Sequence, residues 1–128
     1  MLIIKPVQDK ALQKELCERC CVEYREESLC YQAHDEDVFV GICQFDMGQI
    51  GYIYDLCNPS GVDDEEALFI MGRQTMNFMD LCGTHEAVFS PQSPTSEHLI
   101  KWLGFRMKED RWYMDLHGVF DKHAHRHD

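Results

Sequence analysis

The alternation of apolar and polar residues predicts a strand, a loop and a helix at the centre of the chain. Gly51–Cys57 is an aromatic and β-branched run, which suits a half-buried strand. Residues 58–61 then break the pattern, because proline lacks a backbone donor and glycine tolerates positive φ. The helix that follows has apolar positions on more than one narrow stripe and ends at Gly83. We therefore expect a mostly buried helix packed across a sheet.

The same patterns place six further strands and two further helices along the chain. The strands are expected at residues 2–7, 29–33, 38–45, 86–90, 106–108 and 112–116. The helices are expected at residues 10–25, capped by Asp9, and 97–103, capped by Ser96 and ended by Gly104. The order β-α-β-β-β-α-β-α-β-β predicts a single α/β (α+β) domain with a mixed central sheet and helices on both faces. We expect the domain at residues 1–118 and a polar, His-rich tail at 119–128.

The composition of the chain limits the binding partners and the cellular location that we expect for the protein. The chain has 128 residues, a net charge of −11 and a pI near 4.9, so we expect neither nucleic acid nor an anionic membrane surface as a partner. No apolar run approaches the roughly 20 residues that span a bilayer, and residues 1–4 are too short for a signal peptide. Seven cysteines are scattered through predicted helices and strands, which indicates reduced thiols. The expected location is the cytoplasm.

Element order and two short motifs give a resemblance to a known family. Leu103-Gly104-Phe105 stands where the GNAT acetyltransferase superfamily closes its late helix, and Cys57-Asn58-Pro59 resembles that family's Val-x-Pro step. The resemblance covers residues 1–116 and implies a GNAT-like fold. It also implies an N-acyltransferase that transfers an acetyl or acyl group from acetyl-coenzyme A to a small-molecule or peptide amine.

The resemblance places the site along the central strand and the loop that follows it. The implied cofactor-binding residues are Tyr54, Leu56, Cys57, Ser60, Gly61 and Val62. The candidate catalytic residues are Asp55, a carboxylate inside a strand, and His85, whose side-chain type suits acid–base chemistry near neutral pH. Asp55 would act as a base toward an amine, or it would pair with a Lys or Arg of the neighbouring strand. The plain alternative for His85 is a surface residue, which is the commoner role of a lone histidine at a strand edge, and Cys57 is the thiol we would test for reactivity.

Two departures from the family's pattern keep a second function open. The family's loop carries a glycine-rich signature whose amides hold the coenzyme A pyrophosphate. Here residues 60–66 contain one glycine and four consecutive carboxylates, and Ile100 stands where the family often has its general-acid tyrosine. Exposed carboxylates facing a pyrophosphate would cost on the order of 1 kcal/mol each. The alternative is a catalytically inactive GNAT-fold binding or regulatory protein that recognises a cationic partner, with a homodimer as one form.

Those four carboxylates also have a plain structural interpretation, because negative charge in the first turn complements the helix dipole. The tail holds a weak metal candidate at His123, His125 and His127, since alternate residues of an extended segment point to one side. Ordering a tail costs entropy, which favours adventitious metal binding. Cys17, Cys20 and Cys21 include a Cys-x-x-Cys without a second pair at zinc-site spacing, so we expect small core residues.

Overall fold

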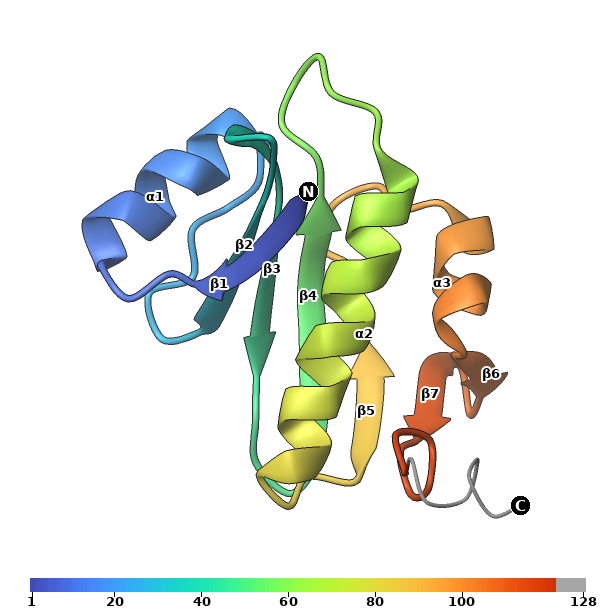
Figure 1. Ribbon diagram of the computed structural model, residues 1–128. Coiled ribbons are helices and arrows are strands. Elements are labelled where there is room, and N and C mark those ends of the chain that lie inside the picture. Colours follow the sequence, from blue (N-terminus) through green and yellow to red (C-terminus); the bar gives the residue numbers. More distant parts are fainter. Residues whose placement is uncertain (122–128) are drawn as a thin grey trace.

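The computed structural model describes residues 1–121, which contain seven strands and three helices (Figure 1). The strands are β1 (Leu2–Pro6), β2 (Leu29–Asp35), β3 (Val38–Asp46), β4 (Gly51–Cys57), β5 (Glu86–Phe89), β6 (Arg106–Lys108) and β7 (Arg111–Asp115). The helices are α1 (Lys10–Arg19), α2 (Glu65–Leu81) and α3 (Glu97–Leu103). This is the predicted element order, and most boundaries agree within a few residues.

The first helix is shorter than predicted. α1 begins at the expected cap, where Asp9 accepts a hydrogen bond from the Ala11 N–H at 2.9 Å, but it ends at Arg19 and not at residue 25. The Gln44 side chain of β3 accepts from the Arg25 N–H at 3.1 Å and donates to the Glu23 carbonyl at 2.9 Å. The backbone after α1 is therefore held by a buried side chain, which replaces the partners that further helical turns would supply.

The strands form one mixed sheet in the order β1-β2-β3-β4-β5-β7-β6. Every neighbouring pair is antiparallel except β4 and β5, which run parallel. The predicted four-residue turn after β2 is tighter than expected, because β2 extends to Asp35 and only Glu36 and Asp37 form the turn. Both turn residues have positive φ, as does the pair that joins β6 to β7, which matches the twist of a two-residue hairpin.

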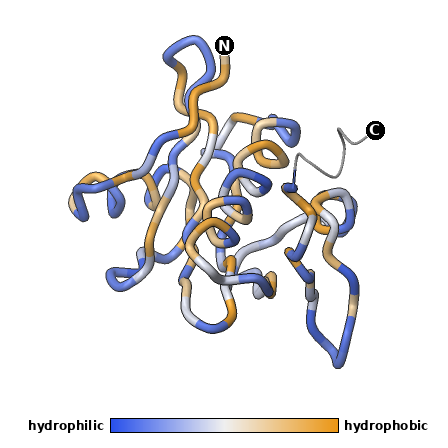
Figure 2. The backbone as a smooth tube through the Cα atoms, turned by 60° about the horizontal axis from the view of Figure 1, so that its bottom comes forward, coloured by the Kyte–Doolittle hydropathy of each residue, from blue (hydrophilic) through white to orange (hydrophobic). Residues whose placement is uncertain are grey.

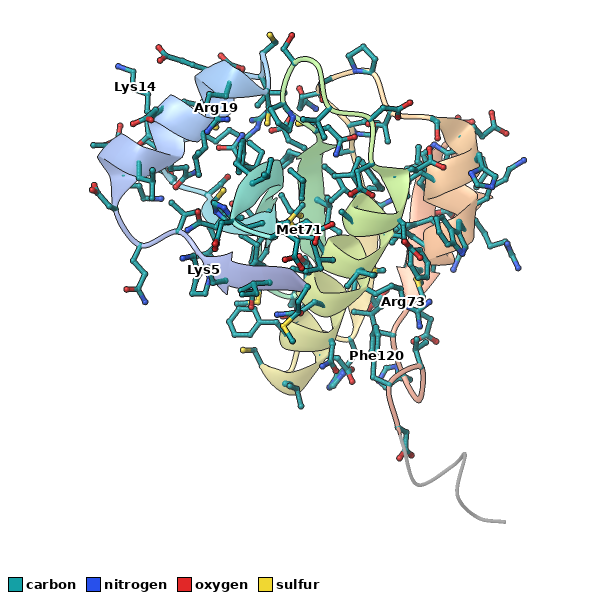
Figure 3. All side chains as sticks on the ribbon, turned by 45° about the horizontal axis from the view of Figure 1, so that its top comes forward. Lys5, Lys14, Arg19, Met71, Arg73 and Phe120 are labelled. Carbon is teal, nitrogen blue, oxygen red and sulfur yellow. The ribbon has the colours of Figure 1, made fainter. Side chains whose placement is uncertain are left out.

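Helices cover both faces of the sheet, as predicted. α2 and α3 pack on one face, and Met71 of α2 is fully buried at the centre of that core (Figures 1 and 3). α1 packs on the other face through Leu16 and Cys17. The neighbouring β3 residues Ile42 and Cys43 belong to different cores, because successive side chains of a strand point to opposite faces. Each fully buried apolar side chain contributes roughly 1.5–3 kcal/mol of transfer free energy.

Figure 2 shows hydrophilic colour on the outer turns, while hydrophilic and hydrophobic residues alternate along the helices, as expected for helices with one buried face. Val119 and Phe120 pack against the main core, and the Arg73 guanidinium carbon lies 5.1 Å from the Phe120 ring centroid (Figure 3). The described start of the predicted tail therefore contacts α2. Among residues 1–121, the helices are too short or too polar to cross a membrane.

Candidate functional site

The sheet opens at its parallel pair. Only Gly51–Ile53 of β4 pair with β5, whereas β4 continues to Cys57. Beyond that pairing the chain after β5 makes a hydrogen bond from the Gln92 N–H to the Tyr54 carbonyl at 2.9 Å and then leads toward α3. The second half of β4 is thus paired with β3 and diverges from β5. This opening exposes the carboxyl end of a central strand, where open α/β sheets commonly bind ligands.

A β-bulge lies at the opening. The register between β3 and β4 shifts at Tyr54, which is the extra residue of β4. A bulge re-aims side chains, and here Tyr54 and its neighbour Asp55 both contact Arg25, from the connection after α1. The Arg25 guanidinium carbon lies 4.6 Å from the Tyr54 ring centroid, and its Nε lies 3.3 Å from Asp55 Oδ2. The bulge therefore places two polar side chains on the face that α1 covers.

A cavity of about 350 Å³ lies at the carboxyl end of β4. It is enclosed by the end of α1, the β4–α2 loop, the start of α2 and the β5–α3 connection, which converge around the arrowhead of β4 in Figure 1. Its lining residues are Cys20, Cys21, Leu56, Cys57, Asn58, Val62, Asp63, Glu65, Leu68, Ser93, Pro94, Thr95, Ser96 and Leu99. The volume falls at the lower end of the range of small-molecule sites, roughly 300–1,000 Å³.

Asp55 is 1% exposed and lies behind the cavity wall. Its carboxylate accepts hydrogen bonds from Gln44 Nε2 at 2.7 Å and Arg25 Nε at 3.3 Å, and Ser93 Oγ lies 3.5 Å away. Gln44 in turn accepts from Gln13 Nε2 at 2.9 Å. Asp55 therefore ties α1, β3 and the β5–α3 connection together. Asp55 does form an ion pair, which was one of the two roles expected for it. Its cation is Arg25, from the connection after α1, and not a residue of the neighbouring strand.

Tyr54, predicted to bind the cofactor, packs on the α1 face of β4 and does not line the cavity. Its ring stacks on Tyr52 with 6.2 Å between the centroids, and its hydroxyl donates to Asp46 Oδ2 at 3.0 Å. Burial raises the pKa of Tyr54, and the hydrogen bond to Asp46 raises it further. A tyrosine in this position remains protonated at neutral pH and holds the bulge in place.

The other five predicted cofactor-binding residues divide into two groups. Leu56, Cys57 and Val62 line the cavity. Ser60 and Gly61 belong to the same loop but lie outside the lining set, and the Ser60 N–H donates to the carbonyl of Arg19 at 3.0 Å. The structure thus brings the end of β4 to the cavity and turns the tip of the loop toward α1.

Cys57 does not have the environment of a reactive thiol. Interaction with the Cys20 thiol, which lies 3.7 Å from the Cys57 carbonyl, raises the pKa of Cys57, and burial raises it further. The thiolate is the reactive form of cysteine, so this environment disfavours the reactive form of Cys57. Cys20 is itself buried beside it, and burial raises the pKa of Cys17 to about 12. Cys17 and Cys20 are therefore the small core residues that the sequence predicted, while Cys21 follows the helix with a φ of 58° and is exposed.

His85 lies at the wrong end of the sheet to join the cavity. It precedes β5, whereas the cavity lies at the carboxyl end of the parallel strand β4. Its Nδ1 is 2.5 Å from Asp80 Oδ1, and its ring stacks on His117 with 4.7 Å between the centroids. The structure therefore places His85 away from the cavity and does not bring His85 and Asp55 together.

The loop that would hold a pyrophosphate is closed by its own side chains. Asn58 Nδ2 donates to the Val40 carbonyl at 2.6 Å, and Asn58 Oδ1 accepts from the Asp64 N–H at 3.2 Å. Asp64 then caps α2 by accepting from the Ala67 N–H at 3.1 Å. Within the described chain every buried side-chain nitrogen and oxygen already has a partner. These loop residues do not fit the diphosphate of coenzyme A, because the Asn58 and Asp64 side chains already hold the Asp64 and Ala67 N–H groups and the loop adds negative charge.

Several residues of this region were not singled out from the sequence. They are Arg25, Gln13 and Gln44 in the network behind Asp55, and Asn58, Ser93 and Thr95 at the cavity. One signal was present, because Gln44 interrupts an otherwise apolar run and is fully buried. The contacts of Arg25 and Ser93 join segments 30 and 38 residues apart and left no local pattern.

Metal ligands are not assembled in the part of the chain described, since residues 1–121 contain no group of three or more His, Cys, Asp or Glu that could hold an ion. The candidate set His123, His125 and His127 lies outside the described residues.

Comparison with solved structures shows the fold of the GNAT acetyltransferases. An IAA acetyltransferase from Bacillus cereus superposes with a TM-score of 0.72 at 14% identity, covering 91% of this chain and 100% of that one. A Bacillus subtilis acetyltransferase in complex with CoA gives 0.69 at 15% identity over 91% and 99% of the two chains. A GNAT family acetyltransferase from Brucella melitensis in complex with acetyl-CoA gives 0.65 at 13% identity over 90% and 88%. No protein-family profile and no curated protein sequence matches the chain.

Proposed function

We propose that the protein is an N-acyltransferase that transfers an acyl group from a pantetheine thioester, the class that includes acetyl-coenzyme A, to an amine. The observation that carries the proposal is the cavity where β4 diverges from β5, with Leu56 and Cys57 of the diverging strand in its wall. Similar folds crystallised with CoA and with acetyl-CoA support the same class of donor.

The cavity wall suits an extended arm with amide groups. Leu56, Leu68 and Leu99 give it an apolar side, while Ser93 and Thr95 place hydroxyl groups on the β5–α3 connection. Ligand sites of this size are commonly lined by apolar side chains with a few polar groups that set the orientation. The bound thioester would supply the activated acyl group, and the chain would contribute the position of the arm.

Asp55 has a positioning role in this proposal. Its carboxylate already accepts hydrogen bonds from Gln44 and Arg25, and 1% exposure leaves no path for a substrate amine. It acts through Ser93 and Arg25, which it fixes beside the opening of the sheet. The acceptor amine would approach past the carboxylates of Asp63 and Glu65, whose charge favours a cationic molecule.

The first test is binding of S-acetylpantetheine to isotope-labelled protein, followed by amide chemical shifts. We expect shifts at residues 56–58 and 93–96 and, with a panel of primary amines and a lysine peptide, an acetylated product with equimolar thiol release. Thr95→Trp should fill the cavity and abolish binding. Gln92→Trp is the matched control, because Gln92 lies on the same connection, is exposed and does not line the cavity. Absence of binding by both S-acetylpantetheine and acetyl-coenzyme A would overturn the proposal.

One observation favours a second function, a binding protein for a cationic ligand without acyl transfer. Asp63 and Glu65 line the cavity and no basic residue of the described chain does. Under this alternative, a polyamine such as spermidine binds to the wild type and loses affinity in Asp63→Asn/Glu65→Gln. The amine panel then yields no acetylated product with any thioester.

A further inference from the structure

The loop after β4 directs its backbone donors inward. Three alternate N–H groups are used within the protein: Ser60 to the Arg19 carbonyl at 3.0 Å, Val62 to the Pro59 carbonyl at 3.0 Å, and Asp64 to Asn58 Oδ1 at 3.2 Å. A loop that binds a diphosphate works through free N–H groups that converge on the ligand. These three donors are therefore used within the protein and are not available to a ligand.

The N-terminus of α2 is occupied as well. The Asp64 carboxylate accepts from the Ala67 N–H at 3.1 Å, and Glu65 and Glu66 follow in the first turn. A carboxylate at this position satisfies one of the helix donors that would bind a phosphate at an anion-binding terminus. The protein's own carboxylates therefore lie at the helix terminus where the phosphate groups of a ligand would have to bind.

The cavity wall next to this terminus is anionic. Asp63 and Glu65 both line it, and none of its described lining residues is Lys, Arg or His. Ser96 Oγ donates to Glu65 Oε2 at 2.8 Å, and His98 Nδ1 lies 2.9 Å from Oε1. These two contacts lower the pKa of Glu65, so the group is a carboxylate at neutral pH. A diphosphate here would meet two like charges with no cation to offset them.

The other described lining residues carry no charge. Leu56, Leu68, Leu99 and Pro94 are apolar, and the hydroxyl of Thr95 donates to the Ser93 carbonyl at 3.2 Å. Such residues suit a neutral chain of methylene and amide groups. The lining therefore combines apolar residues, which suit the arm of coenzyme A, with two carboxylates, which disfavour its diphosphate.

We propose that the cavity selects a pantetheine thioester that lacks the adenosine diphosphate of coenzyme A. This inference rests on the proposed function, because it concerns the donor of the same acyl transfer. The apolar lining residues bind the acylated arm, and the carboxylates of Asp63 and Glu65 exclude the diphosphate.

The test is a series of three ligands that share the acylated arm. S-acetylpantetheine carries no phosphate, S-acetyl-4′-phosphopantetheine carries one, and acetyl-coenzyme A carries the full nucleotide diphosphate. Calorimetry on the wild type at about 20 mM and about 300 mM salt measures each dissociation constant. We expect S-acetylpantetheine to bind about tenfold more tightly than acetyl-coenzyme A at low salt, with the monophosphate between them and a smaller gap at high salt.

A double variant tests the cause. Asp63→Asn/Glu65→Gln removes both charges from the wall, and we expect the affinity for acetyl-coenzyme A to rise about fivefold while that for S-acetylpantetheine changes less than about twofold. Glu109→Gln/Asp110→Asn is the charge-matched control, since these exposed residues form the turn between β6 and β7. That control should leave both affinities unchanged.

The outcomes separate the two proposals. Equal or tighter binding of acetyl-coenzyme A to the wild type would show that the diphosphate is accommodated, which overturns this inference and leaves the acyltransferase proposal intact. If none of the three ligands binds up to about 5 mM, the acyltransferase proposal fails and the inference fails with it. The three dissociation constants of the wild type test the inference on their own, so the result does not depend on the stability of the double variant.

Discussion

The two faces of β4 meet very different neighbours. Toward α2, Ile53 and Leu56 pack among fully buried apolar side chains such as Met71 and Leu103. Toward α1, the buried residues Gln13, Gln44 and Asp55 form a hydrogen-bonded chain, in which each polar side chain has a partner. One face stabilises the domain by burial alone, whereas the other specifies where particular groups lie beside the cavity.

That contrast has a consequence for tolerance to substitution. An apolar core responds to volume, so a residue of similar size can replace another at small cost. A buried polar chain responds to chemistry, because removing one member leaves a donor or acceptor without a partner. The α2 face should therefore dominate stability, and the α1 face should dominate the geometry of the site.

The largest expected effect comes from opening the apolar face. Met71→Ala should lower the free energy of unfolding by about 3 kcal/mol, because a fully buried side chain is replaced by a cavity. Urea denaturation followed by circular dichroism measures the change. Ile70→Ala, at the neighbouring and 40% exposed position, is the control and should cost well under half as much. Similar losses for both would mean that Met71 is not at the centre of the core.

The next effect comes from breaking the polar face. Asp55→Ala should cost about 2 kcal/mol, because it leaves Gln44 Nε2 and Arg25 Nε without their acceptor. Asp55→Asn retains one oxygen acceptor and should recover part of the loss. Unlike Met71→Ala, Asp55→Ala should also shift the amide resonances of Ser93, whose side chain lies next to the carboxylate. If the amide resonances of residues 93–96 were unchanged in Asp55→Ala, Asp55 would not position the β5–α3 connection.

A smaller effect is expected where the two faces meet, at the start of α2. Asp64→Ala removes the N-cap and should cost about 1 kcal/mol, since the Ala67 N–H loses its acceptor. Asp64→Asn keeps a capping oxygen without the charge, so it should stay near wild-type stability. Thermal unfolding compares the three proteins. If Asp64→Asn is as unstable as Asp64→Ala, the contribution of this residue comes from its charge and not from the cap.

Much of the fold could be predicted because its signals are local. The caps Asp9 and Ser96, the terminator Gly104 and the alternation along the strands each act within a few residues, and they agree with one another. The end of α1 could not be predicted, because it depends on Gln44 reaching back from another element. Local propensity does not encode such a contact.

The site was only partly predictable for the same reason. Leu56, Cys57 and Val62 line the cavity, and the resemblance had named all three because it places the site at the end of the central strand and its loop. His85 does not reach the cavity, because nearness to β5 along the chain does not say which end of that strand lies beside it. The parallel pairing of β4 and β5, a long-range feature, puts His85 at the far end. The partner of Asp55 was equally non-local.

The smallest expected effect links the first turn of α2 to the start of α3. Hydrogen bonding by Ser96 and His98 lowers the pKa of Glu65 below its ordinary value of 4.5, so the contact stabilises the protein above that pH. Its contribution is lost as the pH falls through the lower pKa of the folded state. Glu65→Gln should therefore lose less stability than the wild type between about pH 5 and pH 3, measured as the urea midpoint at each pH. The effect is small because the carboxylate is 38% exposed and solvent screens it.

Glu66→Gln, which removes the same charge one residue further along α2, should keep the wild-type pH dependence. If the stability of Glu65→Gln fell with pH as steeply as that of the wild type, the contact of Glu65 with Ser96 and His98 would not stabilise the protein.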